Sequence, residues 1–192
     1  MTLEIRLLEE KLLSHGRFKL TMTKAEVVEA DGSRRVLNHE IYHYEPAAAI
    51  LLYDPERGVV LLVRQVRLGG FVGGALQPMI EACAGMLDGD EPEAGIVRET
   101  MEETGVAVRA ARHVFDAFTS PGAITERISC FVASYNLADR VGAGGGSDAD
   151  ERIEIIEPTL GEALQMIENG EICDAKTIAL LYYARIHDLL SV

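Results

Sequence analysis

The segment from Asp90 to Gly105 constrains the fold more than any other, because it carries both a helix start and a helix end. Asp90, Pro92 and Glu93 suit a first helical turn, where a capping oxygen, a fixed φ and a negative charge stabilise the exposed N–H groups. Gly105 suits the left-handed position that follows a helix. The segment therefore predicts one well-bounded helix in the middle of the chain.

The rest of the chain predicts strands before this helix and a mixture of strands and helices after it. We expect strands at 18–29 and 34–44, paired as a hairpin around Asp31-Gly32, and at 47–53, 59–67, 106–118, 128–135 and 153–156. We expect a glycine-rich loop at 69–74 and a mobile acidic loop at 142–150. We expect further helices at 159–168, opened by the capping-box pair Thr159 and Glu162, and at 176–190. This order predicts an α/β fold with a mixed sheet between helical layers.

The composition narrows the functional classes. The 192 residues, 48% of them apolar, suffice for one core and a short extra module. With 31 acidic and 18 basic residues the net charge is −13, which argues against nucleic acid or an anionic membrane as partner. The longest apolar run, 47–53, is too short to span a bilayer, and the charged first residues predict no signal peptide. Three widely spaced cysteines predict reduced thiols in a cytoplasmic protein.

The central helix also carries a concentration of acidic side chains. On a helical wheel Glu99, Glu102 and Glu103 share one face within about one turn. The opposite face, expected to point into the core, contains Ala94, Val97 and Met101. Such a face either binds a divalent cation such as Mg²⁺, which prefers hard oxygen ligands, or is an ordinary solvated helix surface. The helix alone leaves both interpretations open.

The residues around the helix resemble the Nudix box of a hydrolase family. Gly85 to Glu91 followed by Arg98-Glu99-Thr100-Met101-Glu102-Glu103-Thr104-Gly105-Val106 matches its order of Gly, Glu, Arg-Glu and Glu-Glu-x-Gly. Two departures are a spacer of six residues, not seven, before Arg98 and Thr100 in an aliphatic position. The resemblance spans about 7–190 and is closest to the GDP-mannose members of the ADP-ribose and GDP-mannose pyrophosphatase branch. It includes the segments 64–67, 81–85, 120–126, 144–146 and 174–177.

The resemblance implies an architecture and a set of site residues. Residues 46–192 form a Nudix α/β/α sandwich, and residues 1–45 form a β-hairpin module that makes a homodimer whose partners complete each other's sites. The implied ligands of Mg²⁺, with Mn²⁺ as an alternative, are Glu99, Glu103, Glu151 and the backbone carbonyl of Ala84. The implied catalytic residues are Glu102, braced by Arg98, with Glu126 and Asp150. The implied substrate contacts are Arg67, Ala84, Gly85, Met86, Glu103, Glu126, Asp150 and Lys176, with Arg17, Asn38, His39 and Glu40 from the partner chain.

Several of these residues have a second interpretation. Arg64 and Arg67 lie near a strand end, where surface ion pairs are common, although the planar fork of Arg67 favours phosphate binding. Asp148, Asp150 and Glu151 are either plain loop charge or a lid that supplies a metal ligand and the general base, and the assignment among the three stays open. Arg17 stands where the similar proteins have an aromatic residue, so stacking on a base there depends on the guanidinium.

The resulting hypothesis is a metal-dependent pyrophosphatase acting on a nucleoside diphosphate-sugar. GDP-mannose would give GMP and mannose 1-phosphate. One alternative is the hydrolysis of ADP-ribose with the same residues. A second is a sensor that binds a nucleotide-sugar without cleaving it, which the retention of Glu99, Glu102 and Glu103 argues against. The physiological substrate, the phosphorus that is attacked and the number of metal ions do not follow from the sequence.

Overall fold

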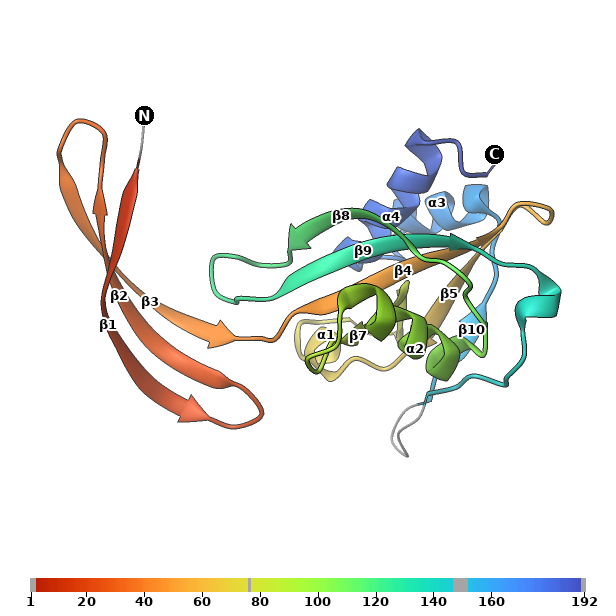
Figure 1. The fold of residues 1–192 in the computed structure, drawn as a ribbon, viewed down its shortest axis with the longest axis horizontal. Coiled ribbons are helices and arrows are strands. Elements are labelled where there is room, and N and C mark those ends of the chain that lie inside the picture. Colours follow the sequence, from red (N-terminus) through yellow and green to blue (C-terminus); the bar gives the residue numbers. More distant parts are fainter. Residues whose placement is uncertain (1–2, 76, 147–151, 191–192) are drawn as a thin grey trace. The chain divides into compact units, whose positions relative to one another are not determined.

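A computed structural model describes residues 3–75, 77–146 and 152–190, which divide between two compact units (Figure 1). The N-terminal unit contains Met1–Glu45 and Phe118–Arg127. The main unit contains Pro46–Ala117 and Ile128–Val192. Each unit has its own sheet.

The N-terminal unit is built on an antiparallel sheet in the order β1-β2-β3. Its strands are β1 (Glu4–His15), β2 (Lys19–Val28) and β3 (Arg34–His43), and Gly32 has a φ of 84° in the β2–β3 turn. The expected hairpin is thus confirmed, whereas strand β1 is absent from the sequence-based expectations. Two register shifts in its pairing with β2 interrupt the alternation of side chains that identifies a strand in a sequence.

The main unit has a mixed sheet that divides along β4 (Ala47–Asp54). On one side β4 pairs in parallel with β9 (Arg127–Ser134), beyond which lies β8 (Arg112–Phe118). On its other side the end of β4 pairs with β5 (Val59–Gln65) and its beginning with β7 (Cys83–Met86). Beyond the residues that pair with β4, strand β5 pairs with β6 (Met79–Glu81) on one side and β10 (Glu154–Ile156) on the other. The divergence of β5 from β4 separates Glu81 on β6 from Ala84 on β7.

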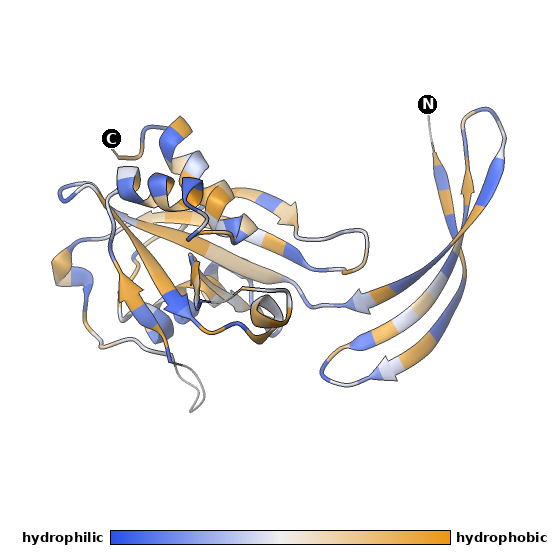
Figure 2. Cartoon of the chain, turned by 180° about the vertical axis from the view of Figure 1, so that it is seen from behind, coloured by the Kyte–Doolittle hydropathy of each residue, from blue (hydrophilic) through white to orange (hydrophobic). Residues whose placement is uncertain are grey.

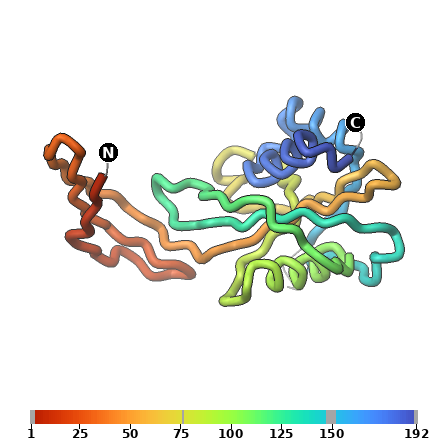
Figure 3. Tube along the Cα trace, turned by 45° about the horizontal axis from the view of Figure 1, so that its top comes forward, coloured from red at the N-terminus to blue at the C-terminus, as the bar shows by residue number. Residues whose placement is uncertain are grey.

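Helices cover both faces of this sheet (Figures 1 and 3). Helix α2 (Pro92–Thr104) packs on β7 and β4, and α3 (Leu160–Glu168) and α4 (Ala175–Ile186) pack on the opposite face. Alternate residues of β4 enter two cores: Ala49 and Leu51 lie under α3 and α4, and Ile50 and Leu52 lie on the side of α2. In Figure 2 the N-terminal strands alternate between hydrophobic and hydrophilic residues, as expected of a sheet without two covering layers.

Local signals locate most element ends. Gly105 has a φ of 69° after α2, and Thr159 forms the expected capping box with Glu162. Four other expectations are wrong. The 69–74 loop includes the short helix α1 (Leu68–Val72), and β8 begins only at Arg112, not at 106. Helix α4 ends at Ile186, not at 190, and the capping position of α2 is Glu91, not Asp90, although Pro92 and Glu93 lie in the first turn as expected. Within the described residues no helix is long and apolar enough to cross a membrane.

Candidate active site

Helix α2 turns its acidic side chains toward the protein, opposite to the expected orientation. Ala94 and Met101, expected in the core, are exposed, and Val97 is only half-buried. The buried side chains are Ile96, Thr100, Glu103 and Thr104. Thr100, the residue in the aliphatic position of the box, donates its hydroxyl hydrogen to the carbonyl of Ile96 at 2.7 Å, so its polar group is satisfied inside the core. The acidic face is therefore largely withdrawn from water.

Glu103 is the most deeply buried of the three carboxylates, at 5% exposure. Burial raises its pKa to about 7, and the charge of Glu99 adds to the rise. The Cys83 thiol, the charge of Arg67 and the backbone N–H of Ala84 act in the opposite direction. Its Oε2 atom has no hydrogen-bond partner among the described residues. A buried carboxylate oxygen without a partner is costly, and a cation would satisfy it.

Glu99 lies against the backbone of strand β7. A side chain at Gly85 would place its Cβ 2.3 Å from the Cδ of Glu99, so residue 85 must be glycine for the carboxylate to occupy its position. Arg98 contacts Glu99 at 2.9 Å. Glu99 and Glu103 thus both lie beside β7, Glu99 against Gly85 and Glu103 against the backbone N–H of Ala84, the residue whose carbonyl is the expected third donor.

Glu102 is half-buried and lies beside Arg98, as expected. The Nη1 of Arg98 is 3.3 Å from each carboxylate oxygen of Glu102. Arg98 is also 3.6 Å from Asp90. One guanidinium therefore contacts three carboxylates, which leaves this end of the site with an excess of negative charge.

A second charged cluster lies across the divergence of β5 and β4. The buried Glu81 accepts a hydrogen bond from the Nε of Arg67 at 2.8 Å, and its other oxygen is 3.4 Å from the Nζ of Lys176. Lys176 also contacts Asp174 at 2.9 Å, at the start of α4. Arg67, the expected phosphate ligand, and Lys176, an expected substrate contact, therefore both contact one carboxylate. Sequence reasoning assigned no role to Glu81 or Asp174, although a lone acid inside the apolar run 79–84 is a signal of a paired buried charge.

The described part of the glycine-rich loop, Gly142 to Gly146, is held on the C-terminal end of α2. Gly145 N–H donates to the carbonyl of Glu103 at 2.9 Å, and Gly146 N–H donates to that of Glu102 at 3.2 Å. A Cβ at Gly144 would lie 2.5 Å from the Glu103 carbonyl oxygen. This segment, the first part of the loop expected at 142–150, thus caps the C-terminal end of α2.

The remaining expected site residues are divided between the two units and the undescribed segment. Met86 ends strand β7 in the main unit. Arg17, Asn38, His39, Glu40 and Glu126 belong to the N-terminal unit. The guanidinium of Arg17 is 5.6 Å from the ring centre of Phe18, so it stacks on its own chain. The expected loop carboxylates Asp148, Asp150 and Glu151 lie outside the described residues. Arg64 pairs with Glu154 at 2.9 Å, in agreement with the surface-pair interpretation.

The described side chains fit part of a divalent-metal site. Within the described residues no three His, Cys, Asp or Glu side chains are grouped so as to hold a metal ion. Glu99 and Glu103 nevertheless supply two hard carboxylate donors beside strand β7, one of them with an unpartnered buried oxygen, and the expected carbonyl of Ala84 would complete a set that suits Mg²⁺ or Mn²⁺. The expected fourth donor, Glu151, follows in sequence after the glycines that cap α2.

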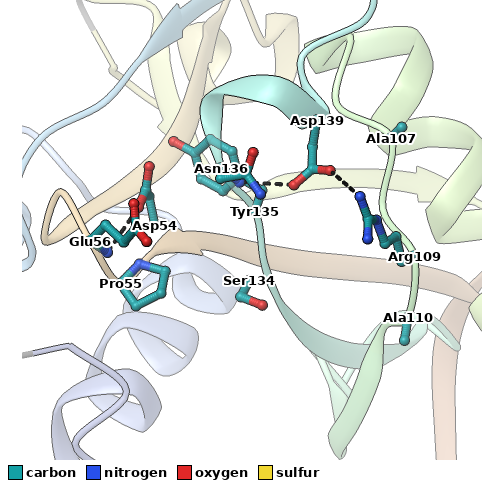
Figure 4. A pocket seen from close by; sticks show the side chains of 10 residues that line it. All are labelled: Asp54, Pro55, Glu56, Ala107, Arg109, Ala110, Ser134, Tyr135, Asn136 and Asp139. Atoms are coloured by element: carbon teal, nitrogen blue, oxygen red, sulfur yellow. Dashed lines mark hydrogen bonds and ion pairs between the residues drawn. The ribbon is translucent and has the colours of Figure 1, made fainter.

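A hollow of about 320 Å³ lies at the other end of the sheet (Figure 4). Asp54, Tyr135 and Asp139 are among the residues that line it. Asp54 ends β4, five residues beyond Ala49, which pairs with Ala84, so the hollow is roughly 16 Å from the acidic site. We place the chemistry at the acidic helix, because the charged groups converge there.

Comparisons with known proteins show the family of this chain. The NUDIX domain matches residues 43–176. The chain belongs to the Nudix family. The expected Nudix fold and the expected hydrolase class are thus confirmed. A protein of Klebsiella pneumoniae named GDP-mannose pyrophosphatase is 43% identical over 192 residues, covering 100% of this chain and 96% of its own. One of Cronobacter sakazakii with the same name is 42% identical over 191 residues, covering 99% and 100%.

A solved structure shares the fold of this Nudix chain. It is described as an ADP compounds hydrolase, and it superposes with a TM-score of 0.73. The match covers 95% of this chain and 92% of that chain. At 17% identity this likeness supports the fold and says nothing about the substrate.

Proposed function

We propose that this Nudix chain hydrolyses the pyrophosphate bond of GDP-mannose to give GMP and mannose 1-phosphate. The observation that carries the proposal is the buried Glu103 on the same helix as Glu99, because a divalent cation would satisfy its unpartnered oxygen. Arg67 and Lys176, which both contact Glu81, supply positive charge for binding the diphosphate. The names of relatives that are 42–43% identical over nearly the whole chain favour GDP-mannose among nucleotide-sugars.

In this proposal Mg²⁺, or Mn²⁺, is held by Glu99, Glu103, Glu151 and the carbonyl of Ala84, and it supplies charge neutralisation at the diphosphate. The chain's own groups orient the substrate: Arg67 and Lys176 bind phosphate oxygens, and the backbone of 84–86 lines the site. Glu102, Glu126 and Asp150 are the candidates for holding and deprotonating the attacking water, Asp150 being the first choice as general base.

The proposal includes a cytoplasmic homodimer. Six leucine and isoleucine side chains are exposed at or near strand β1 of the N-terminal unit: Leu3, Ile5, Leu7, Leu8, Leu12 and Leu13. Such an apolar strip is typical of a surface that a second copy covers. The partner chain then contributes Arg17, Asn38, His39 and Glu40 to the site. The exposed free thiol of Cys173 agrees with a reducing compartment.

The test is a substrate panel with Mg²⁺ that includes GDP-mannose and ADP-ribose, with both products identified. We expect the highest kcat/KM on GDP-mannose. Glu99→Gln should lower kcat by more than about 100-fold, since a ligand of the charge-neutralising ion is lost. Glu93→Gln, a change at an exposed position on the same helix, is the control and should leave kcat unchanged. A higher kcat/KM on ADP-ribose would refute the substrate assignment. Binding without turnover would identify a sensor.

A further inference from the structure

We infer that Glu81 is a positioning residue that orients Arg67 and Lys176 toward the diphosphate. This inference rests on the proposed function and adds a residue to it. Glu81 ends strand β6, and its side chain is 5% exposed. A carboxylate at this depth is stable only when it is paired, and removing one partner of a buried pair is strongly unfavourable.

The geometry of the Arg67 contact leaves the phosphate-binding face of the guanidinium accessible. Glu81 accepts its hydrogen bond from the Nε–H at 2.8 Å. Within the described part of the chain, the two terminal nitrogens of Arg67 have no hydrogen-bond partner, and its side chain is 42% exposed. A planar guanidinium held at Nε presents its terminal N–H groups in a fixed direction, as bidentate recognition of a phosphate requires.

The same carboxylate fixes Lys176 from the opposite side of the cluster. Lys176 lies between Glu81 at 3.4 Å and Asp174 at 2.9 Å, and it is largely buried. Thr177 accepts a hydrogen bond from the N–H of Ala82 at 2.7 Å and donates to Asp174 at 2.6 Å. The start of α4 is thereby attached to the residue that follows Glu81.

Glu81 therefore connects two cations of the site that are distant in sequence, and it lies three residues before the expected metal ligand Ala84. Arg67 follows β5, Lys176 is on α4, and Ala84 is three residues beyond Glu81 on β7. The pair of carboxylates, Glu81 and Asp174, balances the two cations, so the cluster is neutral before substrate binds. Its role is to hold two cations at a fixed separation at the divergence of the strands.

The experiment is a double-mutant cycle between Glu81→Gln and Arg67→Ala, measured as kcat and KM on GDP-mannose with Mg²⁺. Misplacement of a binding group by about 1 Å costs on the order of 100-fold in rate. We expect Glu81→Gln to lower kcat/KM by roughly 10- to 100-fold in the parent chain. In the Arg67→Ala background we expect a clearly smaller loss, about 10-fold or less, because only the orientation of Lys176 then remains to be lost and residues that act as a unit are not additive.

The matched control is the other Arg–Glu pair that involves strand β5. Glu154→Gln removes the partner of Arg64, which is 2.9 Å away, and should leave kcat/KM unchanged in both backgrounds. An equal loss from Glu81→Gln in the parent and Arg67→Ala backgrounds would overturn the inference, as would no loss in either.

Rescue by added guanidinium tests the same inference with Glu81 intact, should Glu81→Gln fail to fold. In Arg67→Ala the vacated position beside Glu81 should accept guanidinium, and activity should rise with its concentration and saturate. Ammonium at equal ionic strength should not restore it, since it lacks the planar fork. Absence of rescue, or equal rescue by ammonium, contradicts the inference.

The two proposals fail in distinguishable ways. If the parent chain turns over neither GDP-mannose nor ADP-ribose, the proposed function is wrong. The cycle is then measured on the binding of inorganic pyrophosphate, which still depends on Arg67 and Lys176. Non-additive losses there would support the role of Glu81 independently of the reaction, and additive losses would refute it.

Discussion

The two units of this chain differ in how far each completes its own core. In the main unit, strand β4 is buried almost throughout, with α2 on one face and α3 and α4 on the other. In the N-terminal unit, every residue of β1 is exposed, including Leu7 and Leu12. A sheet with an exposed apolar edge strand is stabilised by pairing with another chain. The main unit thus has what it needs to fold around the acidic helix, whereas the N-terminal unit suits assembly.

The largest effect is expected from removing exposed leucines of strand β1, and it should appear as a loss of the proposed dimer. Leu7 is 72% and Leu12 is 55% exposed. Burying a leucine contributes roughly 2 kcal/mol, so the four copies in a dimer contribute about 8 kcal/mol. Leu7→Ser with Leu12→Ser should convert a dimer to a monomer at micromolar concentration, as measured by light scattering. Leu137→Ser, which removes a 61% exposed leucine from the main unit, is the control. A dimer that survives the double change would show that β1 is not its interface.

The second effect tests the tight packing of the main unit. Gly144 has a φ of 65°, and a Cβ there would lie 2.5 Å from the carbonyl oxygen of Glu103. Gly144→Ala should lower the free energy of unfolding by about 4 kcal/mol, because it combines backbone strain with a clash against a helix end. Gly16→Ala, in open space in the N-terminal unit, should cost less than about 0.5 kcal/mol. Urea denaturation of both variants measures the difference, and equal losses would contradict the proposed contact.

The fold could be predicted where neighbouring residues decide it. Gly105 ends α2, Thr159 caps α3 and the Asp31-Gly32 turn joins β2 to β3, since each signal acts within a few residues. Strand β1 was missed because two register shifts hide its alternation. The prediction of which face of α2 points inward is wrong. A helical wheel assigns apolar residues to the core, whereas this helix buries Glu103.

The proximity of the acidic residues within the Nudix box could be predicted from the sequence, whereas contacts outside the box could not. The box carries Glu99, Glu102 and Glu103 within one helix, so their proximity follows from helical geometry. The contact of Lys176 with Glu81 joins residues 95 positions apart, and sequence spacing says nothing about it. The attachment of Gly142 to Gly146 to the end of α2 is likewise a tertiary contact. Composition predicts a glycine-rich loop there and does not indicate what the loop contacts.

The third effect is a pH dependence that belongs to the main unit. Burial raises the pKa of Glu103 from 4.5 to about 7. The folded, metal-free chain holds this proton more tightly than the unfolded chain. Protonated Glu103 therefore contributes its full share to the free energy of unfolding below pH 4.5. This contribution, up to about 3 kcal/mol, is lost as the pH rises from 4.5 through about 7. Glu103→Gln should abolish that loss in urea titrations with chelator between pH 4.5 and 8.

Two comparisons make the Glu103 prediction specific. Glu93→Gln, at an exposed position on the same helix, should retain the parent pH profile. Added Mg²⁺ should restore stability to the parent chain above pH 7 and not to Glu103→Gln, since metal binds the deprotonated carboxylate. Parallel profiles for the parent and Glu103→Gln would exclude Glu103 as the titrating group.

The smallest expected effect, that of removing the cap of α3, tests whether the stability of the main unit and the assembly of the N-terminal unit are independent. Thr159 accepts the N–H of Glu162 at 3.2 Å, and Glu162 accepts the N–H of Thr159 at 2.8 Å, at the start of α3. Thr159→Ala should destabilise the main unit by about 1 kcal/mol through the lost cap. Because the cap belongs to the main unit and β1 to the N-terminal unit, the dissociation constant of the proposed dimer, measured by dilution, should not change. A parallel shift in dimer dissociation would mean that assembly depends on the stability of the main unit, and the contrast between a self-sufficient unit and an assembling one would then fail.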